Sequence, residues 1–163
     1  MLSNLGNILL FINVFLSVLI IYFASQNIKT SGNSISKTIY QTTLLQTTLI
    51  FGCFFTLVAA FITSDFSLIN VFENSHTSKP LLYKISGSWG NHEGSLMLWV
   101  IILTIFSFFF LINNKTHPKN YRLFTLIFQN IIILGFLSFI LFNSNPFTLI
   151  SPAPKEGLGL NPI

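Results

Sequence analysis

Four long stretches of the chain are almost entirely apolar, and shorter polar stretches separate them. The apolar stretches cover residues 5–24, 42–63, 95–112 and 123–142, and none contains Lys, Arg, Asp, Glu or His. A helix of about 20 apolar residues crosses the hydrocarbon core of a membrane, which is about 30 Å thick. The pattern predicts an all-α integral membrane protein with four transmembrane helices. A long irregular loop, residues 64–94, joins the second and third helices, and residues 143–163 form a tail.

The composition agrees with this pattern. The chain has 163 residues, of which 52% are apolar and only 7% are charged. Soluble globular domains carry about 25% charged residues, and intrinsically disordered chains need low hydrophobicity. A soluble enzyme and a disordered chain are therefore excluded. Residues 1–163 are expected to form a single transmembrane domain.

The positive charges are divided unevenly between the two sets of loops. The loops at residues 25–41 and 113–122 carry Lys29, Lys37, Lys115, Lys119 and Arg122. The 64–94 loop and the tail, about twice as long together, carry Lys79, Lys84 and Lys155. Short loops rich in Lys and Arg stay in the compartment where a membrane protein is made. We therefore expect both termini and the 64–94 loop on the outer face of the membrane. Topology thus explains the net charge of +4, and nucleic acid is not an expected partner.

Small and polar side chains occur along one face of the second expected span and within the fourth. In the second span they are Thr42, Gln46, Cys53, Thr56 and Ala60, and in the fourth Gln129, Asn130, Gly135 and Ser138. Such residues usually mark contacts between helices in a membrane. No span carries an ionisable acid or base, so a proton relay or an ion channel is not expected. Cys53 is the single cysteine and is predicted to be a buried packing residue.

The 64–94 loop contains two of the three histidines and three of the four acidic residues of the chain. Gly87, Gly90 and Gly94 allow positive φ angles and a close approach of the backbone to a partner. Glu93 and Ser95 flank the expected start of the third helix, where a serine caps free N–H groups and a carboxylate suits the helix dipole.

Two histidines of this loop, His76 and His92, are candidate ligands for a metal or for haem iron. Each is also compatible with an ordinary hydrogen-bonded loop residue, which is the expected role. The pair His92–Glu93 lacks the second histidine of the zinc motif His-Glu-x-x-His, so no metal site is predicted.

Several runs of residues resemble the first large loop of the CcmF/NrfE family of cytochrome c-type biogenesis proteins, which are haem lyases. The most specific run is Trp89, Gly90, Asn91, His92, Glu93, Gly94 and Ser95. Further matching runs lie at residues 64–67, 74–76, 83–85, 145–147, 152–154 and 156–162. The resemblance implies an N-terminal subunit or fragment of the membrane haem lyase, similar to the split CcmF proteins of some mitochondrial genomes.

The resemblance also implies a cofactor, partners and a location. Haem is expected at the level of the complex, and no residue of this chain is expected to be catalytic by itself. The implied partners are the remaining CcmF segments, a CcmH-like protein, the haem chaperone CcmE and apocytochrome c, with membrane lipid around the spans. The implied location is the mitochondrial inner membrane, with the 64–94 loop in the intermembrane space. A bacterial plasma membrane is the alternative.

Site residues are expected in and just after the 64–94 loop. Those expected to shape the loop or contact a partner are Gly87, Trp89, Gly90, Asn91, His92, Glu93, Gly94 and Ser95. The candidates for haem contact are Trp89, His92 and Trp99, the last at the depth where indole rings meet the membrane interface. Two other functions stay open. One is a structural or accessory subunit of a respiratory-chain complex without lyase activity, and the other is a stand-alone haem-binding protein with His92 on the iron.

Overall fold

The computed structural model describes residues 1–32, 34–113 and 116–159, which form six helices. The four long helices are α1 (Leu2–Lys29), α2 (Lys37–Ile62), α5 (His92–Asn113) and α6 (Lys119–Asn143), and the two short ones are α3 (Ile69–Asn74) and α4 (Leu81–Gly87). Each long helix is long and apolar enough to cross a membrane. The predicted all-α membrane fold with four spans is confirmed. Lys115 and the end of the matching tail run, residues 160–162, lie outside the described residues.

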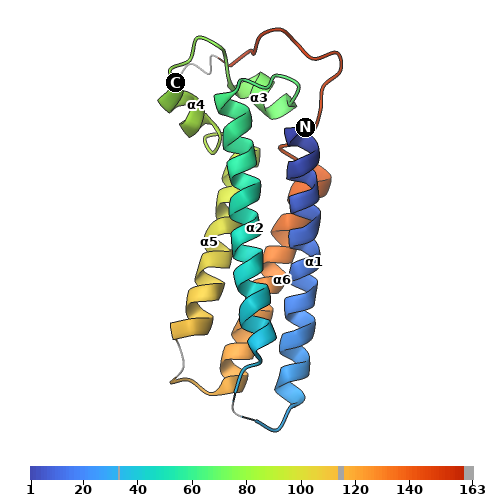
Figure 1. Ribbon diagram of the computed structural model, residues 1–163, viewed down its shortest axis with the longest axis vertical. Helices are drawn as coiled ribbons and strands as arrows, with labels where there is room; N and C mark the ends of the chain where they lie inside the picture. Colours follow the sequence, from blue (N-terminus) through green and yellow to red (C-terminus); the bar gives the residue numbers. More distant parts are fainter. Residues whose placement is uncertain (33, 114–115, 160–163) are drawn as a thin grey trace.

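The long helices form an antiparallel bundle (Figure 1). Helix α1 packs against α2 and α6, and α5 packs against the same two helices on the other side of the bundle. The N-terminus, the segment 63–91 and residues 144–159 all lie at one end (Figure 1). We call residues 63–91 and 144–159 the cap, and the opposite end the loop end.

Polar side chains inside the bundle connect α1 to α2, as the sequence predicts. The Gln46 Nε2 atom donates to Ser17 Oγ at 2.7 Å, and Cys53 Sγ lies 3.5 Å from the Gly6 carbonyl oxygen. Cys53 is a free, fully buried thiol.

Gly135 is an exception to the predicted helix contacts, because its backbone is exposed and no atom lies within 4 Å of the position that a Cβ would take. It borders an apolar groove of about 410 Å³ between α5 and α6.

Two buried cations hold the loop end together. Lys119 Nζ donates to the carbonyl oxygens of Thr30 and Gly32 at 2.9 and 2.8 Å, which neutralises the negative end of the α1 dipole. Arg122 donates to Tyr40 Oη at 3.0 Å and to a backbone carbonyl of α5. The bundle thus carries buried positive charge at the loop end, whereas its four acids all belong to the cap or to the adjoining first turn of α5.

The segment between α2 and α5 differs from the expected irregular loop. It contains α3 and α4, and α5 begins at His92, three residues earlier than the predicted span. Pro80 directly precedes α4 with φ −57°, a backbone angle already suited to a helix start. Helices of six and seven residues are too short to form alone, so no hydrophobic period reveals them in the sequence.

Candidate functional site

The cap is built from two segments that are far apart in the sequence. The Ile69 N–H donates to the Thr148 carbonyl oxygen at 3.0 Å, and the Ile150 N–H donates to that of Ser67 at 2.9 Å. These backbone bonds join the start of α3 to the segment that follows α6. The runs at residues 64–67 and 145–147, which both carry the family resemblance, are therefore neighbours in the fold.

A second set of backbone bonds closes the tail over the end of α3. The Leu158 N–H donates to the Phe72 carbonyl oxygen at 2.7 Å, and the Gly159 N–H donates to that of Ser75 at 3.1 Å. A Cβ at Gly157 or Gly159 would overlap the backbone of Ser75. These two glycines are therefore needed because the tail backbone lies directly on the turn after α3.

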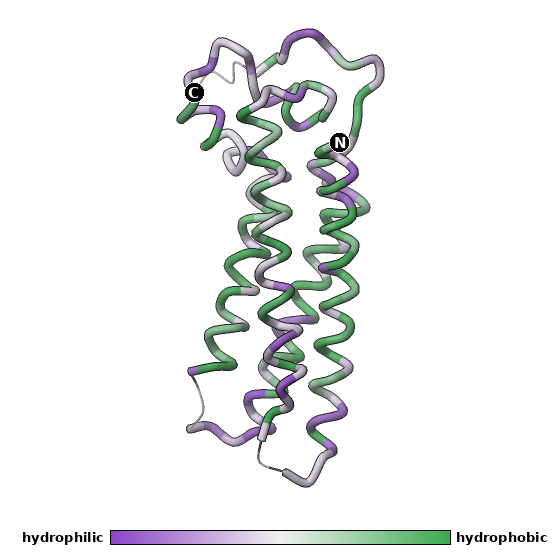
Figure 2. Tube along the Cα trace, viewed as in Figure 1, coloured by the Kyte–Doolittle hydropathy of each residue, from purple (hydrophilic) through white to green (hydrophobic). Residues whose placement is uncertain are grey.

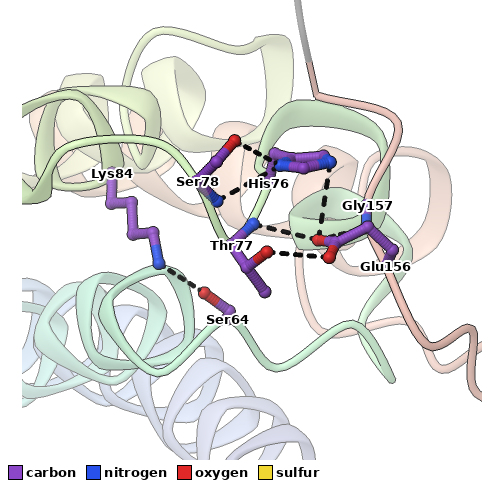
Figure 3. A network of polar contacts seen from close by, with 7 residues as sticks. All are labelled: Ser64, His76, Thr77, Ser78, Lys84, Glu156 and Gly157. Atoms are coloured by element: carbon purple, nitrogen blue, oxygen red, sulfur yellow. Dashed lines mark hydrogen bonds and ion pairs between the residues drawn. The ribbon is translucent and has the colours of Figure 1, made fainter.

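The side chain of Glu156 fastens the tail to the same turn (Figure 3). Its Oε1 accepts the Thr77 N–H at 2.9 Å, and its Oε2 accepts the Thr77 hydroxyl at 2.7 Å. The His76 Nε2 atom is 3.8 Å from Oε1, and its Nδ1 is 2.7 Å from Ser78 Oγ. The two bonds from Thr77 lower the pKa of the Glu156 carboxyl from its usual value of 4.5. His76 is thus the hydrogen-bonded loop residue that the sequence predicts.

We expect the Glu156 contact to weaken in acid. A carboxyl with a lowered pKa in the folded protein stabilises the fold above its unfolded pKa, here 4.5, and loses that contribution as the pH falls through the folded pKa. Hydrogen exchange at the Thr77 amide is the measurement. In Glu156→Gln this amide should exchange faster than in the wild type at pH 6, and the ratio of the two exchange rates should be smaller at pH 3.

Glu73→Gln is the matched control, because Glu73 lies in the same cap with an exposed side chain. It should leave Thr77 exchange unchanged at both pH values. A Glu156→Gln effect of equal size at both pH values would show that the carboxylate charge does not hold the tail.

The start of α5 is fixed by a cluster of polar side chains. Asn91 Oδ1 caps the helix by accepting the Gly94 N–H at 2.7 Å, and Asn91 Nδ2 donates to the Gly87 carbonyl oxygen at 2.7 Å. From α3, Asn70 Nδ2 donates to Asn91 Oδ1 and to Glu93 Oε2, both at 3.0 Å. The run Asn91–Gly94 thus connects α3, α4 and α5, and Glu93 lies in the first turn of α5, where the helix dipole favours a carboxylate.

Two expectations for this segment are wrong in detail. Ser95 does not cap α5, because the helix begins earlier and Ser95 Oγ donates to the His92 carbonyl oxygen at 2.9 Å. No described glycine has a positive φ, so Gly87 and Gly90 are not explained by left-handed backbone. Close approach is the correct reason at Gly94, where a Cβ would overlap the Ser88 carbonyl oxygen.

The three candidate haem contacts turn toward different neighbours. The Trp89 ring packs on Phe54 of α2, with ring centroids 6.4 Å apart. His92 turns toward α6, where its Nδ1 lies 2.8 Å from Ser144 Oγ and its ring meets Phe139 edge-on. Trp99 is 57% exposed and projects from the surface of α5. The structure therefore does not gather these side chains around one ligand.

Trp89 borders a cleft beside α4. The cleft has a volume of about 460 Å³ and is lined by Asn74, Lys79, Tyr83, Ser86, Gly87, Trp89 and Gly90. Lys79 Nζ donates to the Asn74 carbonyl oxygen at 3.0 Å, so the lining includes an ammonium group as well as the rings of Tyr83 and Trp89. Three of the predicted site residues, Gly87, Trp89 and Gly90, meet in this cleft.

Sequence reasoning misses several residues that build the site. Asn70 and Ser144 position Asn91 and His92, and Lys79 and Tyr83 line the cleft. Their positions in the sequence could have indicated two of these residues. Ser144 directly precedes a run that resembles the family, and Asn70 lies between two other such runs. Within residues 1–32, 34–113 and 116–159, no group of three or more His, Cys, Asp or Glu side chains is placed to hold a metal ion.

The chain is similar to several proteins of cytochrome c biogenesis, although no family model matches it. It is 48% identical over 110 residues to the cytochrome c-type biogenesis protein CycK of Rhizobium meliloti, covering 68% of this chain and 16% of that protein. It is 48% identical over 120 residues to ccl1 of Rhodobacter capsulatus, covering 74% of this chain and 18% of that protein. The match to CcmF of Haemophilus influenzae covers the whole chain and 25% of that protein at 34% identity.

The fold is also similar to a solved structure. The chain superposes on the structure named cytochrome c heme lyase CcmF with a TM-score of 0.77 and 20% sequence identity, covering 90% of this chain and 25% of that one. Most of the fold therefore follows an architecture known in that structure. The chain spans between a sixth and a quarter of the length of these proteins (16% to 25%).

Proposed function

Because the chain belongs to the CcmF family of cytochrome c-type biogenesis proteins, and matches their N-terminal part, we propose that it contributes to the membrane complex that attaches haem to apocytochrome c. The observation that carries this proposal is the 34% identity to a CcmF protein along the whole chain. Further support comes from the cap, because the runs that resemble the family assemble there into one hydrogen-bonded unit.

Within that complex the role of this chain is to hold and present the cap. The proposed partners are the remaining CcmF segments, a CcmH-like protein, the haem chaperone CcmE and apocytochrome c. The proposed contact surface is the cleft beside α4, where Trp89 and Tyr83 are 40% and 67% exposed. Exposed Trp and Tyr side chains are enriched at binding surfaces.

Haem is the group that the family implies, and the residues of this chain fit it only in part. The lining of the α4 cleft contains no His, Cys or Met, so among the side chains that usually hold haem iron the cleft offers only Tyr83. His92 is the better candidate, because its Nδ1 is engaged by Ser144 and such a bond orients the ring of a metal-bound histidine. Trp99 lies seven residues further along α5 and so on the same helix face. Trp89 faces α2 and is assigned to partner contact.

We also propose that the cap faces the outer compartment. The described part of the loop end carries Lys29, Lys37, Lys119 and Arg122 and no acid, and positive loops stay on the side of synthesis. The outer compartment is the intermembrane space for a mitochondrial inner membrane and the periplasm for a bacterial plasma membrane.

Replacing Trp89 with alanine tests the proposed function. In cells that depend on this chain for cytochrome c maturation, Trp89→Ala should lower covalent haem in cytochrome c by at least about tenfold, because truncating a central interface Trp costs about 2 kcal/mol or more. Haem-stained gels and immunoblots of the chain are the measurements. Tyr22→Ala is the control, since Tyr22 is similarly exposed on α1, away from the cap.

Purification of the native complex separates the proposed function from the first alternative, an accessory subunit of a respiratory-chain complex. Companions from cytochrome c maturation support the proposal. If only respiratory-chain subunits accompany the chain, and its loss leaves haem attachment intact, then the chain is an accessory subunit of a respiratory complex.

A further inference from the structure

A layer of buried polar side chains crosses the middle of the bundle. Each spanning helix contributes at least one of them, including Asn13 from α1, Gln46 from α2, Ser107 from α5 and Asn130 from α6. All four side chains are 0% exposed. Asn13 Oδ1, Gln46 Oε1, Ser107 Oγ and Asn130 Oδ1 have no hydrogen-bond partner among the described residues.

These four residues lie at similar depth. Counted from the cap end of each helix at 1.5 Å per residue, they lie between about 17 and 24 Å along the axis. The bonds from Gln46 Nε2 to Ser17 Oγ at 2.7 Å and from Thr47 Oγ1 to the Thr104 carbonyl oxygen at 3.3 Å connect α2 with α1 and α5 there. Figure 2 shows hydrophilic segments partway along the otherwise apolar helices.

The amide groups of the layer do not satisfy one another. Asn13 Nδ2 donates to the Leu9 carbonyl oxygen at 2.8 Å, and Asn130 Nδ2 donates to that of Leu126 at 3.0 Å. Their N–H groups are thus directed to their own helices, and their oxygens stay unpaired. The three amide oxygens of Asn13, Gln46 and Asn130 therefore lack partners in the middle of the membrane-spanning bundle, where an unpaired buried polar group is costly.

A small neutral molecule with two donors matches this arrangement. Water donates twice and typically makes two to four bonds to buried polar groups that otherwise lack partners. A cation matches less well, because the middle portions of the four spans contain no carboxylate. We propose that the layer formed by Asn13, Gln46, Ser107 and Asn130 binds a small cluster of water molecules inside the membrane-spanning bundle.

Water-edited solid-state NMR on the full chain in lipid bilayers tests this proposal directly. The chain contains only Gln26, Gln41, Gln46 and Gln129 as glutamines, so labelling glutamine side chains with ¹⁵N gives few signals. Loss of one signal in Gln46→Leu assigns the buried group. We expect the Gln46 amide to receive water magnetisation at a rate comparable with that of Gln26 and Gln41, which are exposed near the loop end.

A second variant tests the cluster. Asn130→Leu removes an acceptor from a different helix and should cause loss of the water signal at Gln46. Thr48→Val is the matched control, because Thr48 is exposed on α2 and bonds to its own helix, and this change should leave the signal intact. A dry Gln46 amide in the folded wild-type protein overturns the proposal, whatever the variants do. The result does not depend on the proposed function, which is tested by haem attachment.

Discussion

Replacing Gly94 with alanine is expected to destabilise the protein by about 3 kcal/mol, the upper end for a group forced into a well-packed site. A Cβ at Gly94 would overlap the Ser88 carbonyl oxygen and would lie 2.8 Å from the Ser88 carbonyl carbon and 3.0 Å from Trp89 Cα. All of these atoms are backbone, so no side-chain rotation relieves the overlap. Unfolding by SDS in mixed micelles, followed by tryptophan fluorescence, measures the loss.

Gly135→Ala is the matched control for this experiment. Gly135 is also helical, but a Cβ there would have no atom within 4 Å. Alanine should therefore stabilise α6 by up to about 1 kcal/mol through helix propensity. If the two variants change stability equally, the contact between Gly94 and Ser88 does not fix the start of α5.

Truncating Phe147 is expected to detach the tail from the bundle. Phe147 is fully buried, and its ring lies so close to Gly6 that a Cβ on this glycine would overlap it. Its backbone is also held, since Ser3 Oγ donates to the Phe147 carbonyl oxygen at 2.7 Å and the Phe147 N–H donates to Asn145 Oδ1 at 2.9 Å. Phe147→Ala should cost about 3–5 kcal/mol, as in other cores, measured by the same SDS unfolding.

Phe142→Ala provides the comparison, because Phe142 lies five residues earlier and is 80% exposed. It should change stability by much less than Phe147→Ala, and it should leave protease cleavage after Lys155 at the wild-type rate. In Phe147→Ala this cleavage should become faster. Equal cleavage rates in the two variants would mean that Phe147 does not hold the tail.

The spans were predictable from the sequence because each is a long apolar run with a physical length requirement. The roles of Gln46 and Cys53 also followed from their positions on one face of the second span. Helices α3 and α4 were not predictable, because each is too short to carry a hydrophobic period. Helix α3 depends instead on bonds to a segment about eighty residues away, such as that from Ile69 to Thr148.

The candidate site was predictable only in part, for a related reason. The run around Trp89 lies where α3, α4 and α5 meet, and Gly94 was correctly expected to permit close approach. The sequence does not reveal that His92 turns to α6 while Trp89 turns to α2, because side-chain directions at the α5 start depend on the Asn91 cap. The contact between Asn70 and Asn91 joins two segments that no local pattern relates.

The pairing of the cap with the tail has a consequence for the time course of folding. A chain is made from its N-terminus, so the part of the cap before α5 emerges well before residues 145–159 exist. Until then α3 lacks its partners Thr148 and Leu158, and Glu156 is not yet there to bind Thr77. The cap is therefore completed only after α6 has entered the membrane. A fully formed cap thus indicates that all four spans have been inserted.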